Sequence, residues 1–194
     1  MTPALLAEDF IHYTEGTSLR YEGDSVLYND FNNSIDTVHF FYTDSLVRID
    51  TVGEQLVYQF ERFISYDGAA YQYQNNYSYN RSNQGVIRYE NVSNHYILPP
   101  KFYLNSTWNG HQFQSTVVQE YTIDSMATLD FAGGFREMVR IKQIEEINLI
   151  EEEIQNEQYI EDYGLLYHYR KSVRKDINTG NIKSGSIVTL ALKP

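Results

Sequence analysis

The sequence predicts a mostly β protein, in which an antiparallel sheet is curved into a partly closed barrel or arranged as a two-sheet sandwich. Three observations predict this fold class. Apolar and polar residues alternate over many short runs, and turn-forming residues separate these runs at short intervals. Aromatic residues make up 15% of the chain, with 18 Tyr and 10 Phe, and both residue types favour strands.

The first half of the chain contains a series of such runs. They span residues 18–28, 35–43, 54–66, 69–79, 85–92 and 95–100. In the third run, Leu56, Tyr58 and Phe60 are spaced two residues apart and therefore share one face of the predicted strand. Asp67-Gly68 directly follows this run and predicts a tight turn into the next strand.

In the second half, Asn109-Gly110 predicts another hairpin turn. The runs that follow it span residues 111–124, 135–147, 164–173 and 185–192. The segment 141–162 is ambiguous, because its isoleucines recur at the three- and four-residue steps of a helix. Since Ile is β-branched and the flanking patterns are those of strands, we predict strands here. The many acids of this segment are expected to form a solvated face, with a cation site as the alternative.

A chain of 194 residues is long enough to bury a core of its own, and we expect one β-rich domain over residues 1–194. Residues 1–9 are expected to be a flexible N-terminal linker. Gly16 is expected in a turn that a Cβ atom would strain, and Trp108 is expected to anchor the neighbouring Asn109-Gly110 turn. The expected core consists of Leu19, Tyr21, Leu56, Tyr58, Phe60, Val117, Tyr121, Val139, Ile141, Leu165, Tyr167, Val188 and Leu190.

The composition excludes several classes of function. The net charge is −11, with 26 acids against 15 bases and no basic cluster, so nucleic acid is not an expected partner. The chain has no cysteine, which excludes disulfides, thiolate metal sites and a thiol nucleophile. It also has no apolar run of the roughly 20 residues that cross a bilayer. The start of the sequence has no basic region and no apolar core of a signal peptide, so the protein is either cytoplasmic or lacks a leader that was removed.

No catalytic, cofactor-binding or metal-binding residue is assigned from the sequence. The motifs of hydrolases, nucleotide-binding proteins and zinc proteases are absent. Residues 30–36 alternate oxygen-bearing side chains as a calcium loop does, but Ile35 occupies the position that requires Gly, so a polar hairpin turn is favoured. Five scattered histidines are expected to be packed or surface residues: His12, His39, His95, His111 and His168. Tyr residues between 66 and 79 are expected on a polar sheet face, with stacking on sugar rings as the alternative.

One tripeptide, an Asp followed by Ser or Thr and then an apolar residue, occurs five times. It can be explained as the start of a strand, because a turn-forming Asp precedes residues that favour strands. It also resembles the short O-glycosylation signal of Bacteroidetes periplasmic and surface proteins. In that case the hydroxyls must be accessible, and each Asp should mark a turn or a strand end. The hydroxyl residues concerned are Ser25, Thr37, Ser45, Thr51 and Ser125.

The segment 10–21 resembles the opening of a family of Bacteroidetes outer-membrane lipoproteins of unknown function. Phe10, Gly16 and Tyr21 match the family pattern. The chain is a divergent member by this resemblance, since His12, Tyr13 and Leu19 stand where the family has Pro, Leu and Trp. Further segments resemble the family's hairpins and strands over nearly the whole chain: 25–38, 58–63, 97–113, 148–154 and 163–173.

This resemblance implies a protein on the periplasmic or surface side of the outer membrane, held there by a lipid on a cysteine that is absent from this sequence together with its leader. The shared motifs are structural, so no active site is implied. We therefore expect a non-enzymatic lipoprotein without a cofactor, acting as an accessory or binding subunit of an outer-membrane protein assembly. Two alternatives remain: a carrier whose β-cup has a large apolar cavity for a lipid, and a glycan or peptide hydrolase with carboxylates or a histidine cluster in a cleft.

Overall fold

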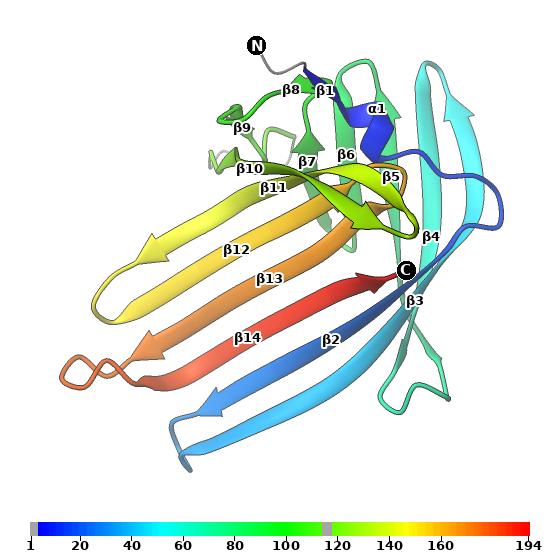
Figure 1. Ribbon diagram of the computed structural model, residues 1–194. Coiled ribbons are helices and arrows are strands. Elements are labelled where there is room, and N and C mark those ends of the chain that lie inside the picture. Colours follow the sequence, from blue (N-terminus) through cyan, green and yellow to red (C-terminus); the bar gives the residue numbers. More distant parts are fainter. Residues whose placement is uncertain (1–3, 114–117) are drawn as a thin grey trace.

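The computed structural model describes residues 4–113 and 118–194. In this part of the chain nearly all regular structure is β-strand, and one long antiparallel sheet curves until it almost closes into a barrel (Figure 1). The predicted fold class is therefore confirmed, with the partly closed barrel as the observed form. Val117, which was expected in the core, lies outside the described residues.

The large sheet has twelve strands and consists of two antiparallel meanders joined in the middle. The first meander contains β2 (Ser18–Asn29), β3 (Ser34–Val52), β4 (Gln55–Ser65), β5 (Gln72–Ser82), β6 (Gly85–Glu90) and β7 (Ser93–Leu98). The second contains β9 (Thr107–Asn109), β10 (Glu120–Phe131), β11 (Gly134–Ile147), β12 (Glu151–Ile160), β13 (Gly164–Lys175) and β14 (Ile182–Lys193). Strands β2 and β14 pair with each other, so the first and last strands of the sheet by sequence lie at its centre.

The two outer edges of the sheet, β7 and β9, approach each other and nearly close the barrel. The Tyr96 backbone N–H donates to the Gly110 carbonyl at 2.8 Å. The Trp108 indole N–H donates to the Tyr96 carbonyl at 2.7 Å, and its ring packs edge-on against Tyr121 at 6.0 Å. Trp108 is therefore a structural anchor beside the Asn109-Gly110 turn, as predicted.

The N-terminal segment closes one end of the barrel. A short pair of strands, β1 (Leu5–Leu6) and β8 (Lys101–Phe102), leads into the single helical turn α1 (Ala7–Phe10). Ala7 and Phe10 are buried, so residues 5–9, which were expected to belong to a flexible linker, form a plug instead. The segment packs against the barrel because burial of its apolar side chains removes them from water. Gly16 follows in a turn with φ +83°, as predicted.

Nine of the expected core residues are buried: Leu19, Tyr21, Tyr58, Phe60, Tyr121, Val139, Ile141, Leu165 and Leu190. Leu56, Tyr167 and Val188 are only half-buried. For Tyr167 the reason is a β-bulge in β13, where Leu166 is an extra residue opposite Gln158 and Tyr159 of β12. As a result His168, and not Tyr167, lies opposite the core residue Leu190.

The ambiguous segment 141–162 forms β11 and β12, so the prediction of strands is confirmed. A bulge between Lys142 and Ile144 accounts for the three-residue step from Ile141 to Ile144, because it inserts one extra residue into the alternation. The hairpin that joins β11 to β12 lies beside the hairpins that join β2 to β3 and β13 to β14. Figure 1 shows these three hairpins extending from the sheet away from the plug.

Candidate functional site

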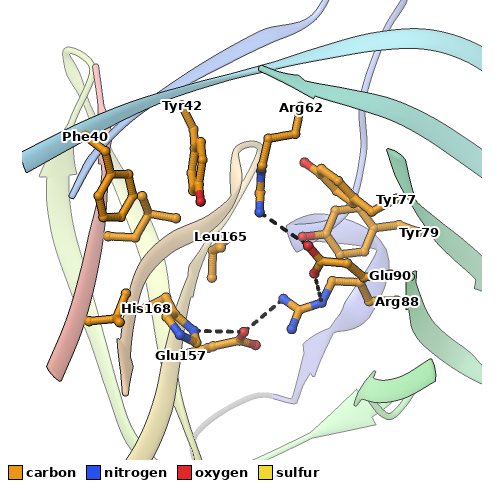
Figure 2. Close-up of a pocket in the computed structure, with 12 residues that line it drawn as sticks. Phe40, Tyr42, Arg62, Tyr77, Tyr79, Arg88, Glu90, Glu157, Leu165 and His168 are labelled. Carbon is orange, nitrogen blue, oxygen red and sulfur yellow. Dashed lines mark hydrogen bonds and ion pairs between the residues drawn. The ribbon is translucent and has the colours of Figure 1, made fainter. Parts of the chain in front are cut away.

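Two features of the molecule are candidates for function: a cavity inside the barrel and the surface at the three hairpin tips. The cavity has a volume of about 210 Å³ and two chemically different walls (Figure 2). Its apolar wall consists of Phe40 from β3, Leu165 from β13, and Val188 and Leu190 from β14. Its polar wall consists of Tyr42, Arg62, Tyr77, Tyr79, Arg88, Glu90, Glu157 and His168.

The first charged pair beside the cavity joins Asp44 of β3 to Arg62 of β4. Arg62 donates from Nε and Nη2 to the two Asp44 carboxylate oxygens at 2.8 Å and 2.7 Å. Asp44 is 0% exposed and also accepts a hydrogen bond from the Tyr77 hydroxyl at 2.8 Å. Burial raises the pKa of Tyr77 well above its usual value, so its phenol stays protonated and acts as a donor.

A second pair crosses the barrel and joins its two halves. Arg88 of β6 lies 2.9 Å from a Glu157 oxygen of β12, although these strands are not neighbours in the sheet. Glu157 also accepts hydrogen bonds from Gln143 at 2.9 Å and Tyr159 at 2.7 Å, and His168 lies 3.2 Å away. Burial by itself would raise the pKa of Glu157, but Arg88, His168 and Tyr159 together lower it far below its usual value.

Glu90 connects these two pairs into a continuous row of alternating charges (Figure 2). One of its oxygens is 3.5 Å from Arg62 and 3.1 Å from the Asn75 amide, and the other is 3.8 Å from Arg88 Nε. Burial would raise the pKa of Glu90, yet the two arginines and Asn75 lower it. We call Asp44, Arg62, Glu90, Arg88, Glu157 and His168 the charge row. Because the pKa values of Glu90 and Glu157 are lowered and both carboxylates are already paired, they are poor general acids.

Two of the scattered histidines meet near the closing edge of the barrel. The rings of His95 and His111 are 5.1 Å apart, and His95 Nδ1 is 3.0 Å from the Tyr121 hydroxyl. Burial, followed by the charge of Arg88, lowers the pKa of His95, so its imidazole is favoured in the neutral form. Among residues 4–113 and 118–194, no three His, Asp or Glu side chains gather in a way that could hold a metal ion.

The hairpin tips opposite the plug carry large apolar side chains in water. We call this set the hairpin-tip surface: Phe31, Ile35, Ile147, Leu149, Ile150 and Ile177. Phe31 is 99% exposed and Leu149 is 77% exposed. The three tips are neighbours, since Asp30, Ile150 and Ile177 line one shallow hollow of about 370 Å³. Within the described chain, no helix has the length and apolarity needed to span a membrane.

Acids outnumber bases around the hairpin-tip surface. The three tips, taken as residues 29–36, 146–153 and 174–183, contain Asp30, Asp36, Glu146, Glu151, Glu152, Glu153 and Asp176 against Arg174, Lys175 and Lys183. Each of the three bases is paired with an acid from one of the three tips: Arg174 with Glu151, Lys175 with Glu152 and Lys183 with Asp176. The hairpin-tip surface is therefore apolar and is surrounded by acidic residues.

The five tripeptides are spread over β2, β3 and β10. None of their hydroxyl residues is buried: Thr37 and Thr51 are exposed, and Ser25, Ser45 and Ser125 are partly exposed. The expectation that each Asp marks a turn or strand end is wrong for Asp24, Asp44 and Asp124, which lie inside strands. Their carboxylates instead bind side chains of neighbouring strands, at 2.8 Å to His39, Arg62 and Arg140.

The tyrosines between 66 and 79 divide between two environments. Tyr77 and Tyr79 are buried and line the cavity, whereas Tyr66, Tyr71 and Tyr73 are exposed. The expected polar sheet face therefore describes only part of this group. The Asn-rich stretch at 29–34 forms the turn between β2 and β3, in agreement with the predicted polar hairpin turn.

Sequence reasoning missed the charge row, although a signal for part of it was present. Arg62 continues the alternation of Tyr58 and Phe60, and Glu157 lies two residues before the buried Tyr159. A charged residue at a position whose neighbours in the alternation are core residues indicates a buried ion pair. Which partner completes each pair depends on the curvature of the sheet, which the pattern does not contain.

Comparison with known proteins finds solved structures that align over most of the chain at low sequence identity. No protein-family model matches the sequence, and no curated protein is similar to it. A solved structure from Bacteroides fragilis, named as an inferred exported protein with a YMCC-like fold, aligns over 95% of this chain and 99% of its own, with a TM-score of 0.48 and 8% identity. An inferred lipoprotein from Parabacteroides distasonis aligns over 95% of this chain and 98% of its own, with a TM-score of 0.43 and 11% identity.

Proposed function

We propose that the protein is a non-enzymatic extracytoplasmic lipoprotein that acts as a binding subunit of an outer-membrane protein assembly. The observation that supports this proposal is the hairpin-tip surface, where three neighbouring hairpins expose large apolar side chains. Exposed apolar groups that gather in one place are typical of interaction surfaces, since exposing them to water costs free energy unless a partner covers them.

A protein partner fits this surface better than a membrane or a second copy does. The surround of the surface is acidic, and its bases are already paired with acids. These acidic residues would repel anionic headgroups, and they would also repel a second copy of this chain, whose net charge is −11. The expected partner therefore presents an apolar patch surrounded by Lys and Arg.

The extracytoplasmic location rests on the sequence resemblance and on the repeated tripeptide. The hydroxyls of Thr37 and Thr51 are exposed, as an attached glycan requires. Mass spectrometry of the protein isolated from its native cells tests this part of the proposal. A lipidated N-terminal cysteine is the expected result, and a mature chain without lipid would contradict the anchor.

The two alternative functions have less support. An apolar-ligand carrier needs a large apolar cavity, whereas this cavity of about 210 Å³ is lined on one side by arginines, glutamates and a histidine. A hydrolase needs a carboxylate that can donate or accept a proton in a cleft. Glu157 is instead held ionised by four neighbouring side chains, which suits a structural role better than a catalytic one.

The docking proposal is tested by replacing three residues of the hairpin-tip surface together: Phe31→Ser, Leu149→Ser and Ile177→Ser. After chemical cross-linking in native cells, the unmodified protein is expected to co-purify with one envelope protein, and the triple variant is expected to lose it. The matched control replaces exposed apolar residues away from the hairpin tips: Val47→Ser, Val52→Ser and Phe135→Ser. This control is expected to retain the partner.

Two further measurements decide between the occupants of the surface. Flotation with phosphatidylglycerol vesicles would reveal lipid binding, and sedimentation velocity would reveal a dimer. Binding to vesicles or dimerisation that the triple variant abolishes would contradict a protein partner. Loss of the envelope protein from both triple variants alike would also contradict the assignment of this surface.

A further inference from the structure

The barrel cavity has chemistry that the docking surface does not use. Its apolar wall comes from β3, β13 and β14, and its polar wall comes from β3, β4, β5, β6, β12 and β13. In Figure 2, Phe40 lies on one side of the cavity, and Tyr77, Tyr79, Arg88 and Glu90 lie on the other. A ligand that fills this space must therefore have one apolar face and one face rich in hydrogen-bonding groups.

The charges of the cavity select against an ionic ligand. Every guanidinium of the charge row is already paired with a carboxylate: Arg62 with Asp44, and Arg88 with Glu157. An added anion would meet the carboxylates of Glu90 and Glu157, and an added cation would meet the two arginines. Either would lose its hydration and meet charges that are already engaged, since both guanidiniums are paired and Glu90 lies between Arg62 and Arg88. The ligand that fits is uncharged.

Hydrogen-bonding capacity nevertheless remains on the polar wall. The Arg88 Nε–H has no hydrogen-bond acceptor among the described residues, and Glu90 Oε2 lies 3.8 Å from it. That distance is too long for a direct hydrogen bond but suits one bridging hydroxyl, which accepts from Arg88 and donates to Glu90. Surrounding side chains cover Arg88 Nε in this structure, so such a group requires the Glu90 side chain, which is 27% exposed, to turn aside.

We propose that the cavity binds a neutral hydroxylated ring, such as a single sugar unit, with its hydroxyls on the charge row and its C–H face on the apolar wall. A hydroxyl is the group that donates and accepts at once without carrying charge. The volume of about 210 Å³ is smaller than a typical drug-sized pocket, which limits the ligand to one ring. The phenols of Tyr77 and Tyr79 extend the polar wall.

The test uses NMR spectra of the labelled protein with four probes of defined structure: the methyl glycosides of glucose, galactose, mannose and N-acetylglucosamine. At least one probe is expected to shift the signals of Leu165, Val188 and Leu190 in a saturable way. Acetate, ethylammonium and lauric acid serve as the anionic, cationic and apolar comparisons. They are expected to leave those signals in place.

Val188→Trp introduces a large side chain at half-buried position 188, which lines the cavity, without removing a charge, and it is expected to weaken glycoside binding at least tenfold. The matched control, Tyr73→Phe, alters an exposed tyrosine outside the cavity and is expected to bind normally. The proposal is overturned if none of the glycosides binds, if Val188→Trp binds as tightly as the unmodified protein, or if a charged or apolar probe occupies the cavity instead. The triple variant of the hairpin tips should bind glycosides normally, so the two proposals fail separately.

Discussion

The barrel end and the hairpin tips are built from the same strands but differ in what covers them. At the barrel end, Leu19 and Tyr21 of β2 are buried beneath the plug and the opposite wall. Towards the tip of the same strand, Leu27 is 50% exposed, and Phe31 in the following turn is 99% exposed. Apolar residues at one end of a strand therefore stabilise the fold, whereas those at the other end are available to a partner. The predictions that follow compare the two ends directly.

The largest contrast is expected between two phenylalanines. Phe60 is fully buried, and its ring packs against Tyr13 at 5.0 Å and Tyr77 at 5.1 Å. Phe60→Ala should lower the free energy of unfolding by about 4 kcal/mol, because it removes buried area and leaves a cavity. Phe31→Ala should change it by less than about 0.5 kcal/mol. Urea denaturation followed by circular dichroism measures both, and a comparable loss in the two variants would contradict the division of roles.

Ion pairs should show a similar but smaller contrast. Arg88→Met leaves the Glu157 carboxylate without its partner across the barrel, and we expect a loss of about 3 kcal/mol in the free energy of unfolding. Lys183→Met breaks the exposed pair with Asp176 at the tips and should lower the free energy of unfolding far less than Arg88→Met does, because solvent screens exposed pairs. Urea denaturation followed by circular dichroism measures the loss of unfolding free energy in both variants. Equal effects would mean that Arg88 does not connect the two halves of the barrel.

The buried tyrosines predict a loss of stability in alkali. Burial raises the pKa of Tyr79 from 10.0 to about 12. The stabilisation linked to this shift is fully present below pH 10 and is lost as the pH rises towards 12, an effect of about 3 kcal/mol. In Tyr79→Phe the decline in unfolding free energy over this range should be shallower than in the unmodified protein. Tyr73→Phe, at an exposed position, is the control, and an unchanged slope in Tyr79→Phe would refute the assignment.

The smallest effect on stability is expected at the exposed tripeptide hydroxyls. Thr37→Ala and Thr51→Ala alter surface side chains and should each change the free energy of unfolding by less than about 0.5 kcal/mol. In native cells, however, the double variant should lose glycan mass if these residues are modified. Intact-protein mass spectrometry measures this difference. Identical masses, apart from the substitutions, would count against glycosylation at these two sites.

Much of the fold could be predicted from alternation and turn residues. The buried faces of Tyr58 and Phe60 and the turn at Gly16 follow from local rules, and they agree with the structure. The bulges could not be predicted from alternation. One inserted residue moves every following side chain of the strand to the opposite face of the sheet. That is why Tyr167 was expected in the core, where His168 is found to face the interior.

The candidate site was less accessible to sequence reasoning. Arg88 and Glu157 are far apart in the chain and in the order of strands, and only the closure of the barrel brings them to 2.9 Å. The plug illustrates the same point, since the short segment 5–10 has no periodicity of its own and is ordered by the cover that the barrel provides. Alternation identifies which residues share a face, but it does not identify what covers that face.

The most direct test of the proposed docking surface is photo-crosslinking at two positions in native cells. Benzoylphenylalanine is placed at Leu149, on the hairpin-tip surface, and in a second strain at Phe135, an exposed control position near the start of β11. Docking through the tips predicts a discrete cross-linked protein from position 149 and none from position 135. Cross-linking from position 135 alone, or equally from both positions, would contradict it.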